Sequence, residues 1–176
     1  MDQAGGHGVA GSRTRVPGYT LDRGIGVDRA GALVDAHDTT TGSRVVIRLL
    51  SPALWSDPGY RRQARHDMRV LEALRHQHLL SVIEFDDRHA AVVCEWVDAI
   101  TLRQLVDVSG RLPTTAALLV FDDALAALEA LHAAGIIHRD VTPTAILLDT
   151  DGTGIVRDAG VPAPSLRRGW RAGTPQ

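Results

Sequence analysis

The chain has 176 residues, and all 19 of its basic residues are arginine, because the sequence contains no lysine. Asparagine is also absent, and 21 acidic residues give a formal net charge of −2. Without lysine the chain cannot form a Schiff base or place an ammonium group on a phosphate. The nearly balanced charge gives no indication of a nucleic-acid or anionic-membrane partner.

Cysteine content and hydropathy limit the cellular compartments in which we expect the protein. The single cysteine excludes an internal disulfide and fits a reducing compartment. No apolar run reaches the roughly 18 residues of a membrane span, and the N-terminus lacks the apolar region of a signal peptide. At 44% apolar and 23% charged residues the composition is typical of a globular protein. We therefore expect a cytoplasmic chain with one domain or two small lobes.

The first half of the chain predicts a sheet with one helix. Residues 1–17 are rich in Gly, Ser, Arg and Gln, and we expect a disordered tail there. A helix is expected after Asp57, which can cap it, with Pro58 in its first turn. Five strands are predicted, at Tyr19–Ile25, Ala32–His37, Arg44–Leu50, Leu80–Phe85 and Ala90–Trp96.

The second half is mainly helical. Thr101 can cap a short helix, and a long apolar helix is predicted at Ala116–Ala134, ended by Gly135. Short strands are expected at Ile136–Ile137, Ile146–Leu148 and Ile155–Arg157. These elements predict an α+β fold with an N-terminal unit at 18–97 and a C-terminal unit at 98–176.

The segment Ile136–Leu148 carries the most specific motif. It contains His138-Arg139-Asp140 and resembles the catalytic loop of protein kinases, H-R-D-L-K-P-x-N-I-L-L. Ten residues later, Asp158-Ala159-Gly160 resembles D-F-G. With the landmarks described below in the right order, residues 19–176 resemble the catalytic domain of bacterial Ser/Thr protein kinases. The resemblance implies an antiparallel five-stranded N-lobe with one helix and a partial, mainly helical C-lobe.

In the catalytic loop the resemblance implies three catalytic positions. Asp140 matches the base that accepts the substrate hydroxyl proton, and Arg139 matches an arginine that meets a phosphate on the activation loop. His138, together with Leu71 and Val82, matches the positions that in relatives pack against the phenylalanine of D-F-G. Asp158 matches the carboxylate that holds magnesium.

Three positions in and after the catalytic loop are changed. Thr142 stands where the family has a lysine that touches the transferred phosphate. Ala145 replaces an asparagine that ligates the second magnesium, and a methyl group cannot bind a hard cation. Ala159 replaces the phenylalanine of D-F-G, which would leave a cavity costing about 3–5 kcal/mol unless neighbours fill it.

The N-lobe motifs are altered as well. Gly26 and Gly31 match the first and third glycines of the phosphate-binding G-x-G-x-x-G loop, but the middle one is Asp28, whose charge would repel a polyphosphate. Arg48 stands where the family has its phosphate-pairing lysine. Asp67 stands in place of the helix glutamate that pairs with this lysine. We therefore hypothesise an Arg48–Asp67 salt bridge that tethers the helix to the sheet.

The adenine side of the expected site is better preserved. In relatives the backbone at the positions of Glu95 and Val97 hydrogen-bonds the adenine, a contact that needs no particular side chain. Cys94 matches the gatekeeper before this hinge. Three apolar residues match the positions that enclose the base: Leu33, Val46 and Leu147.

The resemblance implies ATP and magnesium as cofactors, bound weakly or not at all given five changes: Asp28, Arg48, Asp67, Thr142 and Ala145. We favour a pseudokinase that acts by binding a protein partner. One alternative is an atypical active kinase that transfers the γ-phosphate of ATP to Ser/Thr of a protein substrate. Another is a non-functional fragment of a longer kinase-like protein, since Gly173-Thr174-Pro175 resembles part of an activation segment and the sequence stops there.

Overall fold

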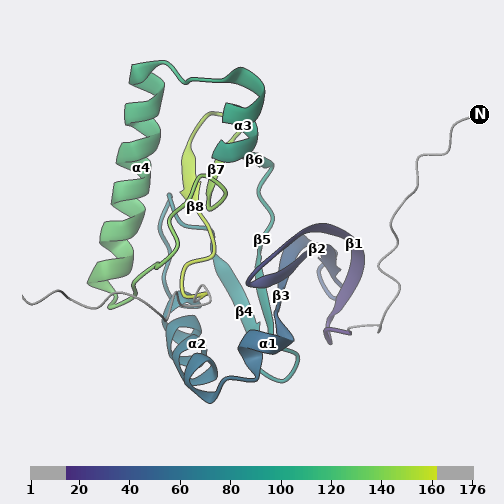
Figure 1. Ribbon diagram of the computed structural model, residues 1–176. Coiled ribbons are helices and arrows are strands. Elements are labelled where there is room, and N and C mark those ends of the chain that lie inside the picture. Colours follow the sequence, from purple (N-terminus) through teal and green to yellow (C-terminus); the bar gives the residue numbers. More distant parts are fainter. Residues whose placement is uncertain (1–14, 162–176) are drawn as a thin grey trace, which may run out of the picture.

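The computed structural model describes residues 15–161, which form two units beside each other (Figure 1). The first unit is a five-stranded antiparallel sheet, as the sequence predicts, and its strand order is β1-β2-β3-β5-β4. Its strands are β1 (Tyr19–Asp28), β2 (Gly31–Asp38), β3 (Arg44–Leu50), β4 (Val82–Asp86) and β5 (Ala91–Glu95).

The alternation of side chains along β3 divides the sheet into two faces. Val45 and Ile47 are buried in a small core on one face. Val46 and Arg48 lie on the other face and line a cleft. Because successive strand residues point to opposite faces, the V-V-I-R sequence places a cation in the cleft and aliphatic groups in the core.

The expected tail, residues 1–17, extends at least two residues too far toward the C-terminus. Val16 is 1% exposed and packs in the same small core as Ala36 and Val45. Its carbonyl oxygen accepts a hydrogen bond from the Tyr19 amide. One aliphatic side chain among polar residues gives no periodic signal, so the sequence did not reveal this contact. Residues 1–14 lie outside the described part.

Two helices follow β3, of which the sequence predicted the second. The four-residue α1 (Pro52–Trp55) was not predicted, since it is too short for a helical period. In α2 (Pro58–Leu71) the expected cap is confirmed, because the Asp57 carboxylate accepts hydrogen bonds from the Gly59 and Tyr60 amides. The buried face of α2 consists of Ala64, Asp67, Met68 and Leu71.

The second unit combines two helices with a three-stranded sheet of order β6-β7-β8. Its elements are β6 (Ala99–Thr101), α3 (Leu102–Ser109), α4 (Thr114–Ala133), β7 (Ile146–Asp149) and β8 (Gly154–Val156). Thr101 caps α3 in a reciprocal capping box with Gln104. Gly135 follows α4 with a φ of 76°, as expected for a glycine that ends a helix.

One expected strand of this unit is absent from the described residues, and one observed strand was not expected. Residues 136–137 form no strand: the Ile136 amide bonds to the Leu131 carbonyl of α4, and Ile136 is completely buried. Burial against α4 therefore explains Ile136, whereas Ile137 is 59% exposed. The strand β6 was not predicted, because its three residues gain strand character only by pairing with β7.

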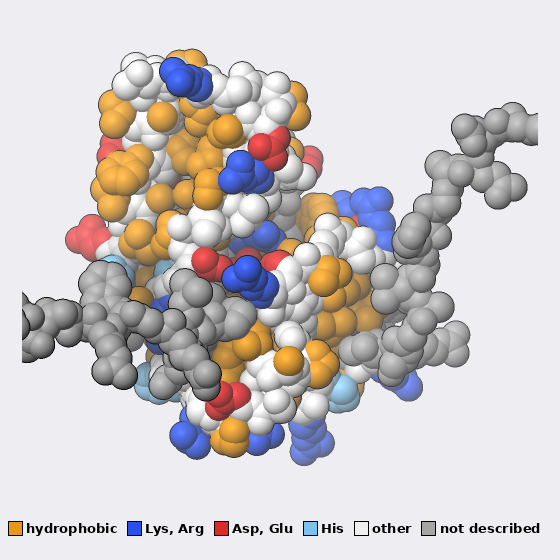
Figure 2. Space-filling model, viewed as in Figure 1, with side chains coloured by type: hydrophobic (Ala, Val, Ile, Leu, Met, Phe, Trp, Pro, Cys, Tyr) orange, Lys and Arg blue, Asp and Glu red, His pale blue; other side chains and the backbone are white. Residues whose placement is uncertain are grey.

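Helix α4 buries one face and exposes another apolar one. Val120, Ala124, Ala127 and Leu131 are buried, at the spacing of one helical face. Apolar side chains also cover exposed parts of the helix, which Figure 2 shows as hydrophobic colour on its surface. These exposed residues are Leu118, Leu119, Phe121 and Leu125. No helix within residues 15–161 is long and apolar enough to cross a membrane.

Candidate functional site

A cleft of about 510 Å³ lies between the two units. Strands β1, β2 and β3, the segment after β5, helix α3, strand β7 and the residues after β8 all contribute to its walls. It brings together seven of the eight residues that the sequence assigned to nucleotide binding: Gly26, Leu33, Val46, Arg48, Glu95, Val97 and Leu147. The metal candidate Asp158 lines the same cleft.

The eighth residue, Gly31, lies behind the cleft wall. Its φ is 139°, and a β-carbon there would collide with the carbonyl oxygen of Leu49. This glycine is therefore required by the close approach of β2 to β3, whatever the cleft binds.

The end of the cleft beside the segment that joins the two units is apolar. Leu33, Val46 and Leu147 line it together with Cys94. Burial raises the pKa of the Cys94 thiol to about 12, with the nearby Asp158 charge adding to the effect, so this cysteine is a neutral packing residue. Val97 lines the cleft, and within residues 15–161 its amide donates no hydrogen bond.

The neighbouring Glu95 is fixed by its own contacts. Its side chain accepts a hydrogen bond from the Ser81 amide at 2.8 Å, and its amide donates to the Ser81 carbonyl at 3.1 Å. Trp96 is held by Arg44, whose guanidinium carbon lies 3.4 Å from the centre of the Trp96 ring. The backbone at this end of the cleft is therefore held by neighbouring side chains and is preorganised.

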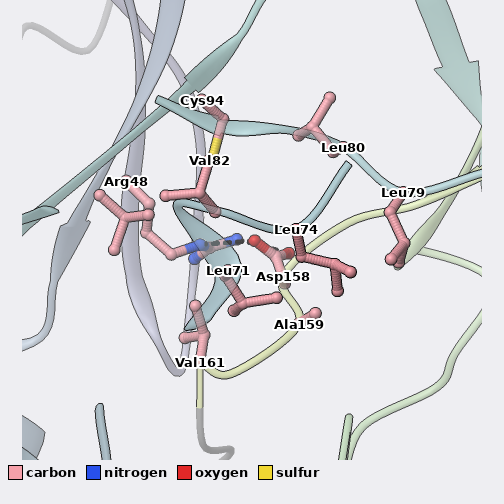
Figure 3. Close-up of a pocket in the computed structure, with 11 residues that line it drawn as sticks. Arg48, Leu71, Leu74, Leu79, Leu80, Val82, Cys94, Asp158, Ala159 and Val161 are labelled. Atoms are coloured by element: carbon pink, nitrogen blue, oxygen red, sulfur yellow. Dashed lines mark hydrogen bonds and ion pairs between the residues drawn. The ribbon is translucent and has the colours of Figure 1, made fainter. Parts of the chain in front are cut away.

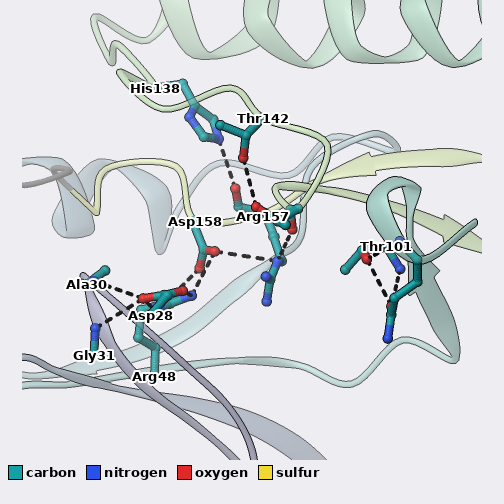
Figure 4. Close-up of polar contacts among 11 residues, drawn as sticks. Asp28, Ala30, Gly31, Arg48, Thr101, His138, Thr142, Arg157 and Asp158 are labelled. Atoms are coloured by element: carbon teal, nitrogen blue, oxygen red, sulfur yellow. Dashed lines mark hydrogen bonds and ion pairs between the residues drawn. The ribbon is translucent and has the colours of Figure 1, made fainter. Parts of the chain in front are cut away.

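At the other end of the cleft Arg48 joins two carboxylates (Figure 4). Its Nε and Nη2 atoms both donate to Asp158, each at 2.8 Å, in a bidentate pair. Its Nη1 and Nη2 atoms donate to Asp28 at 2.9 and 3.1 Å. Arg48 is 2% exposed. Burial works against its charge, but Asp158 and Asp28 raise its pKa above the ordinary arginine value.

Asp28 also binds the backbone of its own turn. Its Oδ1 accepts hydrogen bonds from the amides of Ala30, at 2.8 Å, and Gly31, at 3.2 Å. Partial burial opposes ionisation, but the Arg48 contacts and these two amides lower the pKa of Asp28 below its ordinary value. The Asp28 carboxylate is therefore charged at neutral pH.

The expected Arg48–Asp67 salt bridge is absent from the described residues, and this hypothesis is wrong. Asp67 is 1% exposed and accepts hydrogen bonds from Arg139, at 3.1 Å, and from Gln63, at 2.7 Å. The two carboxylates at the cleft occupy the Arg48 guanidinium, whose planar fork favours bidentate partners. The helix α2 is thus tethered to the loop before β7 rather than to β3.

The three catalytic candidates share this loop but differ in surroundings. His138 is buried, and its Nε2 donates to the Arg157 carbonyl at 2.8 Å while its Nδ1 accepts from the Asp140 amide at 3.3 Å. Arg139 has a φ of 69°, a conformation that costs a non-glycine residue free energy. The Asp140 side chain is exposed, and its carboxylate has no hydrogen bond within residues 15–161.

The residues present do not fit a magnesium ion that bridges to phosphate. Both oxygens of Asp158 accept hydrogen bonds from Arg48. Ala145 is 5% exposed and offers no ligand atom, and the Thr142 hydroxyl is paired with that of Thr144 at 2.8 Å. No three His, Cys, Asp or Glu side chains in the described part gather at a possible metal site.

The expected cavity at Ala159 is largely filled. A space of about 20 Å³ remains, lined by Ala159 together with Leu71, Leu74, Val82 and Val161 (Figure 3). Val161 is 6% exposed and belongs to the main core. Neighbouring aliphatic groups therefore take most of the volume that a phenylalanine would need.

Sequence reasoning missed the most important contact of the site. It treated Asp28 as a group that repels phosphate and did not foresee that Asp28 pairs with Arg48. It also missed Arg157, which lies 3.5 Å from Asp158 and donates to the Thr144 carbonyl. The sequence signal for this ion pair was the presence of Asp28 in place of a loop glycine together with Arg48 in place of a lysine.

Comparisons with known proteins agree with this geometry. The family model described as "Protein kinase domain" matches residues 19–164. The serine/threonine-protein kinase PknA of Mycobacterium tuberculosis is 31% identical over 170 residues, which cover 90% of this chain and 39% of PknA. PknE of Mycobacterium bovis is 30% identical over 158 residues, covering 88% of this chain and 28% of PknE.

Solved structures give the same result. The crystal structure of the M. tuberculosis PknI kinase domain superposes with a TM-score of 0.74 at 27% sequence identity. The match covers 82% of this chain and 59% of the PknI chain. The chain thus spans less than two fifths of the length of the curated relatives named here and about three fifths of that kinase domain.

Proposed function

The chain belongs to the protein kinase family, and from this premise we propose that it is a pseudokinase-type member that acts by binding a protein partner. The observation that carries the proposal is the Asp28–Arg48–Asp158 cluster at one end of the cleft. Phosphoryl transfer depends almost entirely on positioned cations around the phosphates. In this chain the cation at the cleft is already neutralised by two carboxylates.

The remaining phosphate machinery supports the same proposal. Thr142 brings no charge to the catalytic loop, and Ala145 brings no metal ligand. Two of the groups that stabilise a transferring phosphate in relatives are therefore missing from the loop itself. Weak or absent ATP binding follows, because ATP would have to displace Asp28 from Arg48.

A phosphate-transfer assay with the 176-residue chain tests this proposal. We expect no transfer from γ-labelled ATP to the chain itself or to a generic Ser/Thr protein substrate, with magnesium or manganese present. Asp140→Ala is the matched control for contaminating kinases, since a contaminant's signal persists in that variant. Transfer that is present in the wild type and disappears in Asp140→Ala would refute the proposal.

Binding of a partner is supported by the exposed apolar face of α4. Leu119 and Phe121 are 66% and 58% exposed, and Leu118 and Leu125 lie on the same helix. Exposed apolar groups gathered on one helix are typical of interaction surfaces. The proposed location is the cytoplasm, whose reducing conditions suit a chain with a single free cysteine.

An atypical active Ser/Thr kinase is the second candidate, and one observation favours it. The Asp140 carboxylate is exposed and has no hydrogen bond in the described part of the chain, so it is available to accept a proton. This candidate needs Arg48 to release Asp158. The assay above decides between the two candidates directly.

A fragment without independent function is the third candidate. A fragment of that kind would lack a cooperative transition on heating, because its apolar surfaces would associate nonspecifically. A single sharp melting transition of monomeric chain, independent of protein concentration, would argue against it. Light scattering during the melt provides the necessary control for aggregation.

A further inference from the structure

The Asp28 carboxylate has the surroundings of a bound phosphate oxygen. Two successive backbone amides of the β1–β2 turn, at Ala30 and Gly31, donate to it, and a guanidinium group donates from the opposite side. Converging backbone amides and an arginine are a common way for proteins to bind anions. In this chain the bound anion is part of the turn itself.

Arg48 has little hydrogen-bonding capacity left for a second anion. A guanidinium carries five N–H groups, and four hydrogen bonds from Arg48 reach the carboxylates of Asp28 and Asp158. Its side chain is 3% exposed. A phosphate could bind Arg48 only by displacing one of these carboxylates.

The other cations that line the cleft are also paired. Arg157 lies 3.5 Å from Asp158, and Arg103 lies 3.4 Å from Asp107 on α3. Each of the three arginines around the cleft within residues 15–161 therefore has a carboxylate partner. Among the described residues that line the cleft, no arginine is therefore left unpaired to receive the negative charges of a triphosphate.

The opposite end of the cleft keeps what a flat, uncharged ligand needs. Leu33, Val46 and Leu147 provide apolar walls, and the Val97 amide is a donor without a partner in the described chain. The cleft volume of about 510 Å³ lies within the range of small-molecule sites.

We propose that the cleft binds an uncharged nucleoside-type ligand in preference to a nucleoside triphosphate, because Asp28 already occupies the phosphate position. This inference rests on the proposed function, since it assumes the nucleotide cleft of the family. The inference adds the class of ligand, which is a flat heterocycle that carries an uncharged, ribose-like substituent. Binding requires no divalent cation, because Arg48 neutralises the Asp158 carboxylate.

Calorimetric titration of the full chain with adenosine and with ATP tests the preference. We expect adenosine to bind at least about tenfold more tightly than ATP, a difference of about 1.4 kcal/mol. Replacing MgCl₂ by EDTA should change neither affinity by more than about twofold, because binding does not depend on a divalent cation.

Two variants at Asp28 and one control make the test specific. In Asp28→Ala the turn amides and Arg48 are released, so ATP affinity rises at least about tenfold while adenosine affinity stays within about threefold. Asp28→Asn, which keeps the shape of the side chain, moves ATP affinity in the same direction and guards against misfolding of the alanine variant. Asp122→Ala, an exposed acid on α4 outside the cleft, removes the same charge and leaves both affinities unchanged.

The outcomes separate this inference from the proposed function. Wild-type protein that binds ATP as tightly as adenosine without transferring phosphate overturns the inference alone. ATP affinity that fails to rise in both Asp28 variants also overturns it. Absence of binding by every variant to both compounds overturns the inference together with the nucleotide cleft on which it rests.

Discussion

The two ends of the cleft differ in how they depend on side chains. At the end beside Val97, the groups available to a ligand are a backbone amide and apolar walls. At the end beside Asp28, function in relatives needs particular charged groups, and here those groups satisfy one another. Under the proposed function, a few substitutions remove the phosphate chemistry at one end of the cleft and leave the apolar end open.

Asp28 and Arg48 occur together at the end of the cleft beside Asp28, which we call the closed end, because each needs the other. Asp28 without Arg48 would place an unpaired carboxylate beside Asp158. Arg48 without Asp28 would leave a buried guanidinium with one partner and unused donors. Together they form a hydrogen-bonded cluster, which offsets part of the cost of burying charge. The predictions below test this interdependence, beginning with the largest expected effect.

Removing Arg48 should give the largest change in stability. Arg48→Met leaves Asp28 and Asp158 without their common cation, and we expect a loss of about 3 kcal/mol in the free energy of unfolding, at the low end for breaking a buried ion pair. The estimate is low because the Asp28 side chain is 45% exposed and can be hydrated. Urea denaturation followed by circular dichroism measures the loss.

Arg62→Met is the matched control for this measurement. Arg62 is exposed on α2 and forms no ion pair in the described part of the chain, so its replacement should change stability by less than about 0.5 kcal/mol. Equal losses in the two variants would show that the Arg48 cluster contributes nothing to the fold.

The Asp67–Arg139 contact should give the next largest effect. In a double-mutant cycle with Asp67→Asn and Arg139→Gln we expect a coupling of about 1–2 kcal/mol, because Asp67 is nearly fully buried. The cycle of Asp67→Asn with Arg48→Met should show a coupling below about 0.5 kcal/mol. A larger coupling to Arg48 than to Arg139 would restore the pairing expected from the sequence.

The motifs and the order of elements could be predicted from the sequence because they depend on local patterns. Alternation along β3, the Asp57 cap and Gly135 each leave a signal within a few residues. The partners of Asp67 and Arg48 could not be predicted in this way. The partner of each group depends on which of several charged side chains the fold places next to it. Asp158, for example, lies 110 residues from Arg48 in the sequence.

The small cavity beside Ala159 provides a test of packing behind the closed end. Ala159→Phe restores the family residue, but the remaining space of about 20 Å³ is far smaller than a phenyl ring. We expect destabilisation by about 1–2 kcal/mol from overpacking, measured by thermal unfolding. Stabilisation by this substitution would show that the surrounding residues, Val161 among them, can rearrange to admit the ring.

The Arg44–Asp35 ion pair lies beside the other end of the cleft, where Arg44 also holds Trp96. Its loss should have the smallest effect on stability, and this effect should depend on pH. Hydrogen bonds from Arg44, the largest influence, and the charges of Arg44 and Arg23 lower the pKa of Asp35. A carboxyl group whose pKa is lowered by folding stabilises the protein above its unfolded pKa of about 4, and this contribution is lost as pH falls through the lower folded value.

Asp35→Asn tests this pH dependence. The variant should be less stable than the wild type by about 1 kcal/mol at pH 7, through the loss of a charged hydrogen-bond acceptor. The difference should shrink as pH falls below about 4, since the wild-type carboxyl then becomes neutral as well. Melting temperatures from pH 7 to pH 2.5 measure it, and a difference that is constant over this range would contradict the assignment.

The guanidinium resonance of Arg48 tests the central claim most directly. In ¹⁵N-arginine-labelled protein, the Nε–H signal lost in Arg48→Lys identifies this side chain. We predict that titration with ATP and magnesium leaves the signal in place, because Asp28 and Asp158 already hold the guanidinium, whereas Asp28→Ala shifts it. An ATP-dependent shift of this signal in the wild-type protein would show that phosphate reaches Arg48 and would contradict the account.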